Sequence, residues 1–278
     1  MKIMDISKHQ GLIDFDKVKL SEKIDGIMIR ASWGHFHEDE QFRRNVSECE
    51  RLNIPWGAYH YSYALNKDEM KRECAGLIAL LAEMETLYNK KPLLPIAIDM
   101  EDADGYKSRN GTLNNKSLNT EICAYTCEEL EKAGYYAMIY CNLDWKNNKL
   151  YWKELSMYDL WLARWNTSAP GVKCGMWQFT SKDRINGING YVDMSKAYID
   201  YPTLIKQQGL NHWNSEIEPE PEEGKTPDEN GVIFGSYVDL KQPLQVLWMD
   251  ENNYVLALND KDKDSMFACP KKYFKKVA

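Results

Sequence analysis

Two acidic residues at the end of an apolar stretch give the clearest chemical signal in the sequence. Residues 93–98 are apolar, and Asp99 and Glu101 follow them. Side chains two positions apart on a strand point to the same face, so these two carboxyl groups are predicted to lie side by side. A carboxylic acid beside a carboxylate is the pair that glycoside hydrolysis requires: one protonates the leaving oxygen, and the other stabilises the positive charge or orients the attacking group.

Two further acidic residues end apolar stretches that lie far away in the sequence. Asp5 ends one near the N-terminus, and Asp193 ends another. In a closed parallel barrel the first and last strands are neighbours, so all four carboxyl groups would meet at one mouth. Two unit charges about 4 Å apart repel by about 4 kcal/mol at an effective dielectric of about 20. At least one of the four groups is therefore expected to keep its proton near neutral pH.

Other interpretations of these acids compete with the first. Asp99 and Glu101 could be solvated residues after a buried strand, or the cluster could hold Mg²⁺ or Ca²⁺, which prefer oxygen ligands. The chitinase motif Asp-x-x-Asp-x-Asp-x-Glu fails, because its earlier acidic positions are Leu94 and Ala97 here. The histidines show no metal-binding spacing, so neither a metal nor another cofactor is predicted.

The elements that must position these acids alternate along about the first two hundred residues. Apolar residues recur at helical spacing near 42–52, 70–84 and 118–130, between short apolar strands. This alternation indicates a parallel sheet, and eight strands indicate a closed barrel. The last three strands are too close together for full helices, so we expect an irregular parallel (β/α) barrel. The predicted strands are Lys2–Asp5, Gly26–Ala31, Trp56–Tyr61, Leu94–Asp99, Tyr135–Tyr140, Leu160–Ala163, Met176–Phe179 and Tyr191–Asp193.

The composition changes twice after the predicted barrel domain, residues 1–210. Residues 211–230 become acidic and rich in proline, without apolar periodicity, which is typical of a linker. Residues 231–278 return to a β pattern, with a hairpin predicted at 246–258. We therefore predict a small all-β C-terminal module.

Charge and hydropathy argue against two classes of partner. The net charge is −7 and no basic stripe is present, which argues against a nucleic acid. No apolar run approaches the ~20 residues that span a bilayer. The first residues lack the apolar core of a secretory signal, so we expect synthesis in the cytoplasm without a signal peptide.

A set of short motifs occurs in order along residues 1–205. The motifs are DISKHQG at 5–11, GAYHY at 57–61, IDME at 98–101, YCN at 140–142, LWLA at 160–163, MWQFTS at 176–181 and INGYVD at 188–193. Together they resemble the family 25 glycoside hydrolases, the Chalaropsis-type lysozymes. The sequence departs from that pattern at Trp33, where relatives often have Glu, and at Met194 and Ser195.

The resemblance implies a muramidase, which hydrolyses the β-1,4 bond between N-acetylmuramic acid and N-acetylglucosamine in bacterial peptidoglycan with retention of configuration. In that pattern Glu101 is the general acid and base, and Asp99 positions the substrate's N-acetyl group for attack on the anomeric carbon. Asp5 and Asp193 match the other two site carboxylates. The substrate-binding positions of the family are matched by Arg30, Tyr61, Tyr140, Trp165 and Gln178.

We expect the C-terminal module to bind the bacterial cell wall. Modular enzymes of this kind, often phage endolysins, carry such modules, and residues 232–278 are weakly similar to a bacterial Src-homology-3-like barrel. Four lysines near the end could contact anionic wall polymers: Lys271, Lys272, Lys275 and Lys276. We expect a phage or prophage endolysin that acts on the cell wall after release. A catalytically weak wall-binding protein and a metal-dependent hydrolase that uses the carboxylate cluster stay open as alternatives.

Overall fold

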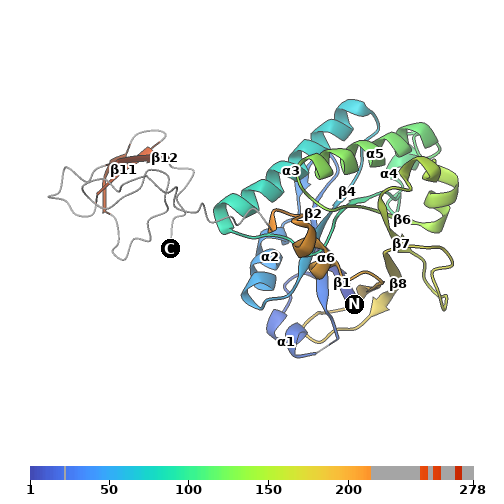
Figure 1. Ribbon diagram of the computed structural model, residues 1–278, viewed down its shortest axis with the longest axis horizontal. Coiled ribbons are helices and arrows are strands. Elements are labelled where there is room, and N and C mark those ends of the chain that lie inside the picture. The colour runs from blue at the N-terminus through green and yellow to red at the C-terminus, as the bar shows by residue number, and fades with distance from the viewer. Residues whose placement is uncertain (22, 214–244, 250–252, 258–266, 271–278) are drawn as a thin grey trace. The chain divides into compact units, whose positions relative to one another are not determined.

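The computed structural model describes residues 1–21, 23–213, 245–249, 253–257 and 267–270 (Figure 1). The chain divides into two units, residues 1–216 and 217–278, which we describe separately. Residues 214–230 of the predicted linker and the four C-terminal lysines lie outside the described residues.

Eight strands of the first unit close into a barrel, in the order β1-β2-β4-β5-β6-β7-β8-β9, with β9 paired to β1. The strands are β1 (Lys2–Ile6), β2 (Gly26–Trp33), β4 (Trp56–Tyr61), β5 (Ile96–Asp99), β6 (Ala137–Asn142), β7 (Asp159–Ala163), β8 (Met176–Asp183) and β9 (Val192–Ala197). A short strand, β3 (His37–Glu38), pairs antiparallel with β2. The closed barrel confirms the predicted fold, and every predicted strand overlaps one of these eight.

One strand differs from the predicted parallel arrangement. β9 is antiparallel to both of its neighbours, β1 and β8, so Asp193 lies near its start and not at its end. A parallel crossover needs about a dozen residues or more, and only residues 184–191 connect β8 to β9. The chain therefore turns straight back. The predicted direction of the last strand was wrong, although Asp193 still lies at the mouth where the parallel strands end.

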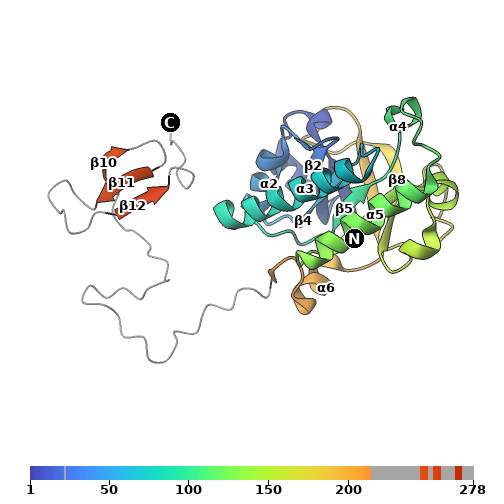
Figure 2. The same cartoon turned by 90° about the horizontal axis from the view of Figure 1, so that it is seen from above.

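Helices cover the barrel on one side more than on the other. α3 and α5 lie side by side over the strands, and α2 packs against β2 (Figure 2). The helices are α1 (Phe15–Leu20), α2 (Phe42–Arg51), α3 (Lys67–Tyr88), α4 (Tyr106–Arg109), α5 (Lys116–Lys132) and α6 (Tyr201–Gln208), with short turns η1 (Lys8–Gln10), η2 (Trp145–Lys149) and η3 (Trp152–Leu155). Between β7 and β8 the described chain forms no helix, as the spacing of the last strands predicted. In the parts of the chain that the structure describes, no helix has the length and apolar character to cross a membrane.

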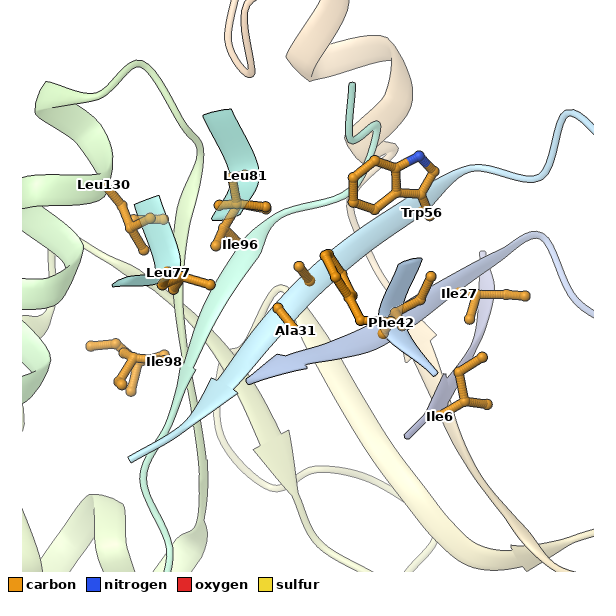
Figure 3. Close-up of a cluster of buried hydrophobic side chains, with 14 of the residues drawn as sticks. Ile6, Ile27, Ala31, Phe42, Trp56, Leu77, Leu81, Ile96, Ile98 and Leu130 are labelled. Carbon is orange, nitrogen blue, oxygen red and sulfur yellow. The ribbon is translucent and has the colours of Figure 1, made fainter. Parts of the chain in front are cut away.

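Alternation along the strands creates two apolar cores. Outward side chains pack beneath the helices: Figure 3 shows Phe42 of α2 and Leu77 of α3 over strand residues such as Ala31 and Ile98. Inward side chains form a second cluster that fills the barrel, with Ile3, Met28, Ala97, Met138 and Met176 among its members. Tyr201 and Ile205 of α6 belong to this inner cluster, so α6 closes the N-terminal end of the barrel.

The residues that follow α6 are tied to the barrel. The Asn211 side chain donates a hydrogen bond to the carbonyl oxygen of Leu94 at 3.1 Å and accepts one from the backbone N–H of Tyr136 at 2.8 Å. Trp213 donates through its indole N–H to the carbonyl oxygen of Pro92 at 2.9 Å. The barrel unit thus extends past residue 210, where the predicted barrel domain ended.

The second unit contains a three-stranded antiparallel sheet, β10-β11-β12. Its strands are β10 (Gln245–Met249), β11 (Asn253–Ala257) and β12 (Phe267–Pro270). The pairing of β10 with β11 is the predicted hairpin, and the described elements of this unit are all strands.

Gly57 provides a test of how tightly the barrel floor is packed. It occupies an inward position on β4, and a Cβ atom there would lie 2.5 Å from the carbonyl oxygen of Pro95 and 2.7 Å from the sulfur of Met28. We expect Gly57→Ala to lower the free energy of unfolding by about 1–3 kcal/mol, as overpacking of a core does. Urea denaturation measures this loss. Gly26→Ala, whose nearest atoms would be 3.0 Å away, should lose less, and equal losses in the two variants would contradict this packing.

Candidate active site

The site forms where the inward residues of the strands change from apolar to polar. Residues i and i+2 of a strand share a face, so an apolar residue deep in the barrel is followed by a polar one nearer the mouth. These inward pairs are Ile3 and Asp5, Met28 and Arg30, Ala97 and Asp99, Met138 and Tyr140, and Met176 and Gln178. The same alternation that fills the floor thus builds a polar ring at the C-terminal ends of the parallel strands.

The structure brings the four predicted carboxyl groups together. Asp5, Asp99, Glu101 and Asp193 all line a cavity of about 620 Å³, and the same four line a smaller cavity of about 60 Å³. Asp5 and Asp193 face each other directly across the β1–β9 pair, and their side chains are hydrogen-bonded. The backbone N–H of Met100 donates to the carbonyl oxygen of Tyr140 at 2.9 Å, which extends the pairing of β5 and holds Glu101 toward the same cavity as Asp99.

Burial raises the pKa of all four carboxyl groups, and repulsion by neighbouring carboxylates adds to the rise in Asp5, Asp99 and Glu101. Burial raises the pKa of Glu101 to about 7, with further contributions from the charges of Asp193 and Asp104. Burial also raises the pKa of Asp193 to about 6. The pKa values of Asp5 and Asp99 lie well above their ordinary range for the same reason, aided by nearby carboxylates. Glu101 therefore keeps its proton up to near neutral pH.

A chain of hydrogen bonds links three of the predicted substrate-binding residues to Asp5. The Gln178 side-chain N–H donates to Asp5 Oδ2 at 3.1 Å. Its Oε1 accepts from the Tyr140 hydroxyl at 3.1 Å and from the Trp165 indole N–H at 3.0 Å. Tyr140 and Gln178 line the smaller cavity, whereas Trp165, which is 46% exposed, lines neither of the two cavities.

The other two predicted substrate-binding residues, Arg30 and Tyr61, line the larger cavity. Arg30 donates from Nε to Asp39 Oδ2 at 2.8 Å, and both side chains are buried. Within the described residues, Arg30 Nη2 and Asp99 Oδ1 are buried without a hydrogen-bond partner. The Tyr61 hydroxyl donates to Asp104 Oδ1 at 3.3 Å. The site thus holds a donor and an acceptor that no described residue satisfies.

Sequence analysis missed several residues that line the cavities. Tyr59 precedes Tyr61 by two positions on β4, and Trp161 lies inward on β7, so strand alternation could have placed both. Tyr63 and Asp104 come from loops, for which alternation gives no signal. Their side chains are hydrogen-bonded to each other, and Asp104 Oδ1 also accepts from the backbone N–H at the start of α4 at 3.1 Å.

The departures from the expected family pattern have local explanations. Trp33 lines the larger cavity, and its ring lies 5.9 Å from that of Tyr63 in an edge-on arrangement. Ser195 is fully buried and accepts a hydrogen bond from the Trp161 indole N–H at 2.9 Å. Met194 belongs to the outer apolar core. Only Trp33 therefore changes the lining of the larger cavity.

The arrangement suits acid–base chemistry on a glycoside. A protonated carboxylic acid beside other carboxyl groups, in a groove at the mouth of an α/β barrel, is what glycoside hydrolases use to break the bond between two sugars. In the described part of the chain, no group of three or more His, Cys, Asp or Glu side chains has a geometry that could hold a metal ion.

The class of protein that this fold and site define agrees with the comparisons. Residues 4–188 match the family described as Glycosyl hydrolases family 25, and the chain belongs to that family. Lysozyme M1 of Streptomyces globisporus is 24% identical over 200 residues, which cover 69% of this chain and 66% of the relative. The chain thus spans slightly less than two thirds of that protein's length. The uncharacterized protein YegX of Escherichia coli K12 is 23% identical over 201 residues, which cover 69% of this chain and 67% of YegX.

Solved structures show the same fold. The modular autolysin LytC of Streptococcus pneumoniae, solved with a synthetic peptidoglycan ligand, aligns with a TM-score of 0.61 and 27% identity over 70% of this chain and 46% of LytC. The CTP1L endolysin aligns with a TM-score of 0.59 and 23% identity over 74% of this chain and 69% of its own. A bacterial lysozyme of Streptomyces coelicolor aligns with a TM-score of 0.58 and 21% identity over 77% of this chain and 98% of its own.

The raised pKa of Glu101 predicts how stability depends on pH. Its pKa rises from an ordinary value of 4.5 to about 7, so the folded chain binds more protons than the unfolded chain between these values, and stability falls as the pH rises through them. A shift of that size corresponds to about 3 kcal/mol as an upper bound. Glu101→Gln cannot ionise and should be more stable than the parent at pH 8 by up to this amount, with no gain at pH 4.

Denaturant unfolding at the two pH values measures this difference. Glu154→Gln is a matched control, because Glu154 is exposed on η3 and lies outside both cavities. A Glu101→Gln variant that is no more stable than the parent at pH 8 would show that the ionised Glu101 carries no burial cost.

Proposed function

We propose that this chain is a peptidoglycan hydrolase, an N-acetylmuramidase that cleaves the β-1,4 bond between N-acetylmuramic acid and N-acetylglucosamine with retention of configuration. The observation that carries the proposal is Glu101, a carboxylic acid with a pKa of about 7 that shares a cavity with Asp99. The names of similar proteins support the substrate class, because they include a lysozyme and an autolysin solved with a peptidoglycan ligand.

In the proposed reaction Glu101 acts first as an acid and then as a base. It protonates the glycosidic oxygen while the carbonyl oxygen of the substrate's own N-acetyl group attacks the anomeric carbon. Asp99 orients that group: its buried Oδ1, which has no hydrogen-bond partner among the described residues, can accept the acetamido N–H. Glu101 then takes a proton from the water that opens the cyclic intermediate. Two inversions at the same carbon give net retention.

The remaining polar residues would support these two. Asp5 and Asp193 are hydrogen-bonded to each other and burial raises the pKa of both, so we propose that the pair shares a proton, which limits the negative charge beside Glu101. Gln178 fixes Asp5 at 3.1 Å and is itself fixed by Tyr140. We propose that Arg30, Tyr61, Tyr140, Trp165 and Gln178 contact the sugar chain.

We further propose a modular organisation, with a catalytic barrel over about residues 1–213, a linker near 214–230 and a wall-binding module over 231–278. In this proposal the enzyme is a phage or prophage endolysin that acts on the cell wall after release. Two of the similar solved structures are endolysins, CTP1L and ply40 of a Listeria monocytogenes bacteriophage, which supports this assignment. The module's partners would be peptidoglycan or anionic wall polymers.

Loss of the acid should nearly abolish activity. We expect Glu101→Gln to slow the clearing of bacterial wall suspensions by about 10²–10⁴-fold, the usual contribution of a general acid. Reducing-end analysis of digested peptidoglycan should find new N-acetylmuramic acid ends for the parent chain. New N-acetylglucosamine ends would indicate a glucosaminidase, and clearing by Glu101→Gln at the parent rate would remove Glu101 from the mechanism.

Reducing-end release, measured together with wall sedimentation and in the presence of EDTA, distinguishes the proposed muramidase from the two alternatives. A wall-binding protein with weak catalysis would sediment with walls but release few reducing ends. A metal-dependent hydrolase would lose activity in EDTA, whereas the proposed mechanism predicts unchanged rates in the chelator.

The pH dependence of the rate tests what sets the pKa of Glu101. We expect kcat/KM to fall with rising pH near the Glu101 pKa of about 7, as the acid loses its proton. Asp104 raises that pKa through its charge, so Asp104→Asn should move the alkaline limb to lower pH. Tyr63→Phe removes the hydrogen bond to Asp104 but leaves the charge, and its alkaline limb should stay in place. A limb that moves equally in both variants would show that the loop's geometry, and not the charge, sets the pKa.

A further inference from the structure

Asp39 is a buried acid at the site that no sequence motif singled out. It lies between β3 and α2, and its exposure is 1%. Its backbone is fixed at both ends: its N–H donates to the carbonyl oxygen of Ala31 at 2.9 Å, and its carbonyl oxygen accepts from the N–H of Phe42 at 2.9 Å. The carboxylate therefore projects from a rigid backbone.

Three hydrogen bonds occupy the Asp39 carboxylate. Oδ2 accepts from Arg30 Nε at 2.8 Å and from the backbone N–H of Lys8 at 3.0 Å, and Oδ1 accepts from the backbone N–H of Gln41 at 3.0 Å. Asp39 thus ties together η1, β2 and the start of α2. Arg30 bonds to Asp39 through its side chain, and it lines the larger cavity beside the four carboxyl groups.

The contact with Asp39 does not use the terminal nitrogen Nη2 of Arg30. Only Nε is engaged, and Nη2 is buried without a hydrogen-bond partner in the part of the chain that is described. A buried donor without a partner is costly, and a charged donor forms the stronger hydrogen bonds once an acceptor arrives. Nε is held in place by Asp39, and the terminal nitrogen Nη2 is left to donate a hydrogen bond to an oxygen atom of a ligand.

We propose that Asp39 is a positioning residue, which holds Arg30 by Nε so that its terminal nitrogens bind an oxygen acceptor of the sugar chain. This inference rests on the proposed function. The acceptor is a carbonyl or carboxylate oxygen, for which two sources exist on the glycan. One is the N-acetyl group that both sugars carry, and the other is the lactyl carboxyl group that only N-acetylmuramic acid carries.

A double-mutant cycle tests whether Asp39 acts through Arg30. All variants carry Glu101→Gln, so that the glycan is not consumed, and isothermal titration calorimetry gives Kd for two soluble probes of equal length. One probe alternates N-acetylglucosamine with N-acetylmuramic acid, and the other contains N-acetylglucosamine alone. We expect Arg30→Met and Asp39→Asn each to weaken Kd for the alternating probe about tenfold or more. The double variant should bind no more weakly than Arg30→Met.

Glu40→Gln is the matched control. Glu40 is the next residue along the chain, its side chain is 71% exposed, and it pairs with the Lys8 ammonium and not with Arg30. Its Kd should equal that of the parent. Weakening of both probes would assign the acceptor to the N-acetyl group, and weakening of the alternating probe alone would assign it to the lactyl carboxyl group. An Asp39→Asn effect that persists in full without Arg30, or no effect of either variant, would overturn the proposal.

A measurement without any change at Asp39 covers the case in which Asp39→Asn does not fold. In the folded Glu101→Gln chain labelled with ¹⁵N-arginine, the Arg30 guanidinium signals are assigned by their loss in Arg30→Lys. Addition of the alternating probe should shift the terminal Nη signals while Nε–H stays protected from exchange. Unchanged Nη signals at saturation would overturn the proposal. Failure of the proposed function would appear separately, as wall lysis by Glu101→Gln.

Discussion

Repulsion among carboxyl groups that share one poorly solvated mouth is the constraint on which the rest of the structure depends. Asp5, Asp99, Glu101 and Asp193 come from three distant parts of the sequence, and each has a raised pKa because burial penalises its charge. Bringing these groups together costs free energy, so the fold must gain more free energy elsewhere than this costs. Two apolar cores supply that gain, one inside the barrel and one beneath the helices.

The charges that surround Asp99 differ from those that surround Glu101. Burial and the charges of Glu101 and Asp5 raise the pKa of Asp99 well above its ordinary range, and the cations of Arg30 and Lys107 only partly oppose that rise. Burial and the charges of Asp193, Asp104 and Asp102 raise the pKa of Glu101. Neighbouring carboxyl groups with different surroundings can take different roles, and in the proposed mechanism Glu101 donates the proton while Asp99 orients the N-acetyl group.

Period-two alternation explains why so much of the site could be predicted from the sequence. Asp99 and Glu101 follow an apolar run, and the same rule places Asp5 at the mouth. The direction of β9 was missed because apolar alternation reads the same in both directions along a strand. Tyr63, Asp104 and Asp39 were missed because they belong to loops, where contacts with distant residues decide the geometry. Alternation places Asp5, Asp99 and Glu101 at the mouth, whereas the predicted roles of the site residues come from the resemblance to family 25.

The helix that closes the far end of the barrel has a consequence for how a polymer can enter. Tyr201 and Ile205 of α6 pack against the residues that fill the interior, among them Met138 and Met176, so the described barrel is a basin with a solid floor. A long sugar strand cannot be threaded through such a basin and has to lie across its rim. Binding across a rim requires no free chain terminus. For the activity proposed above, this architecture is compatible with cleavage of a cross-linked mesh at interior bonds.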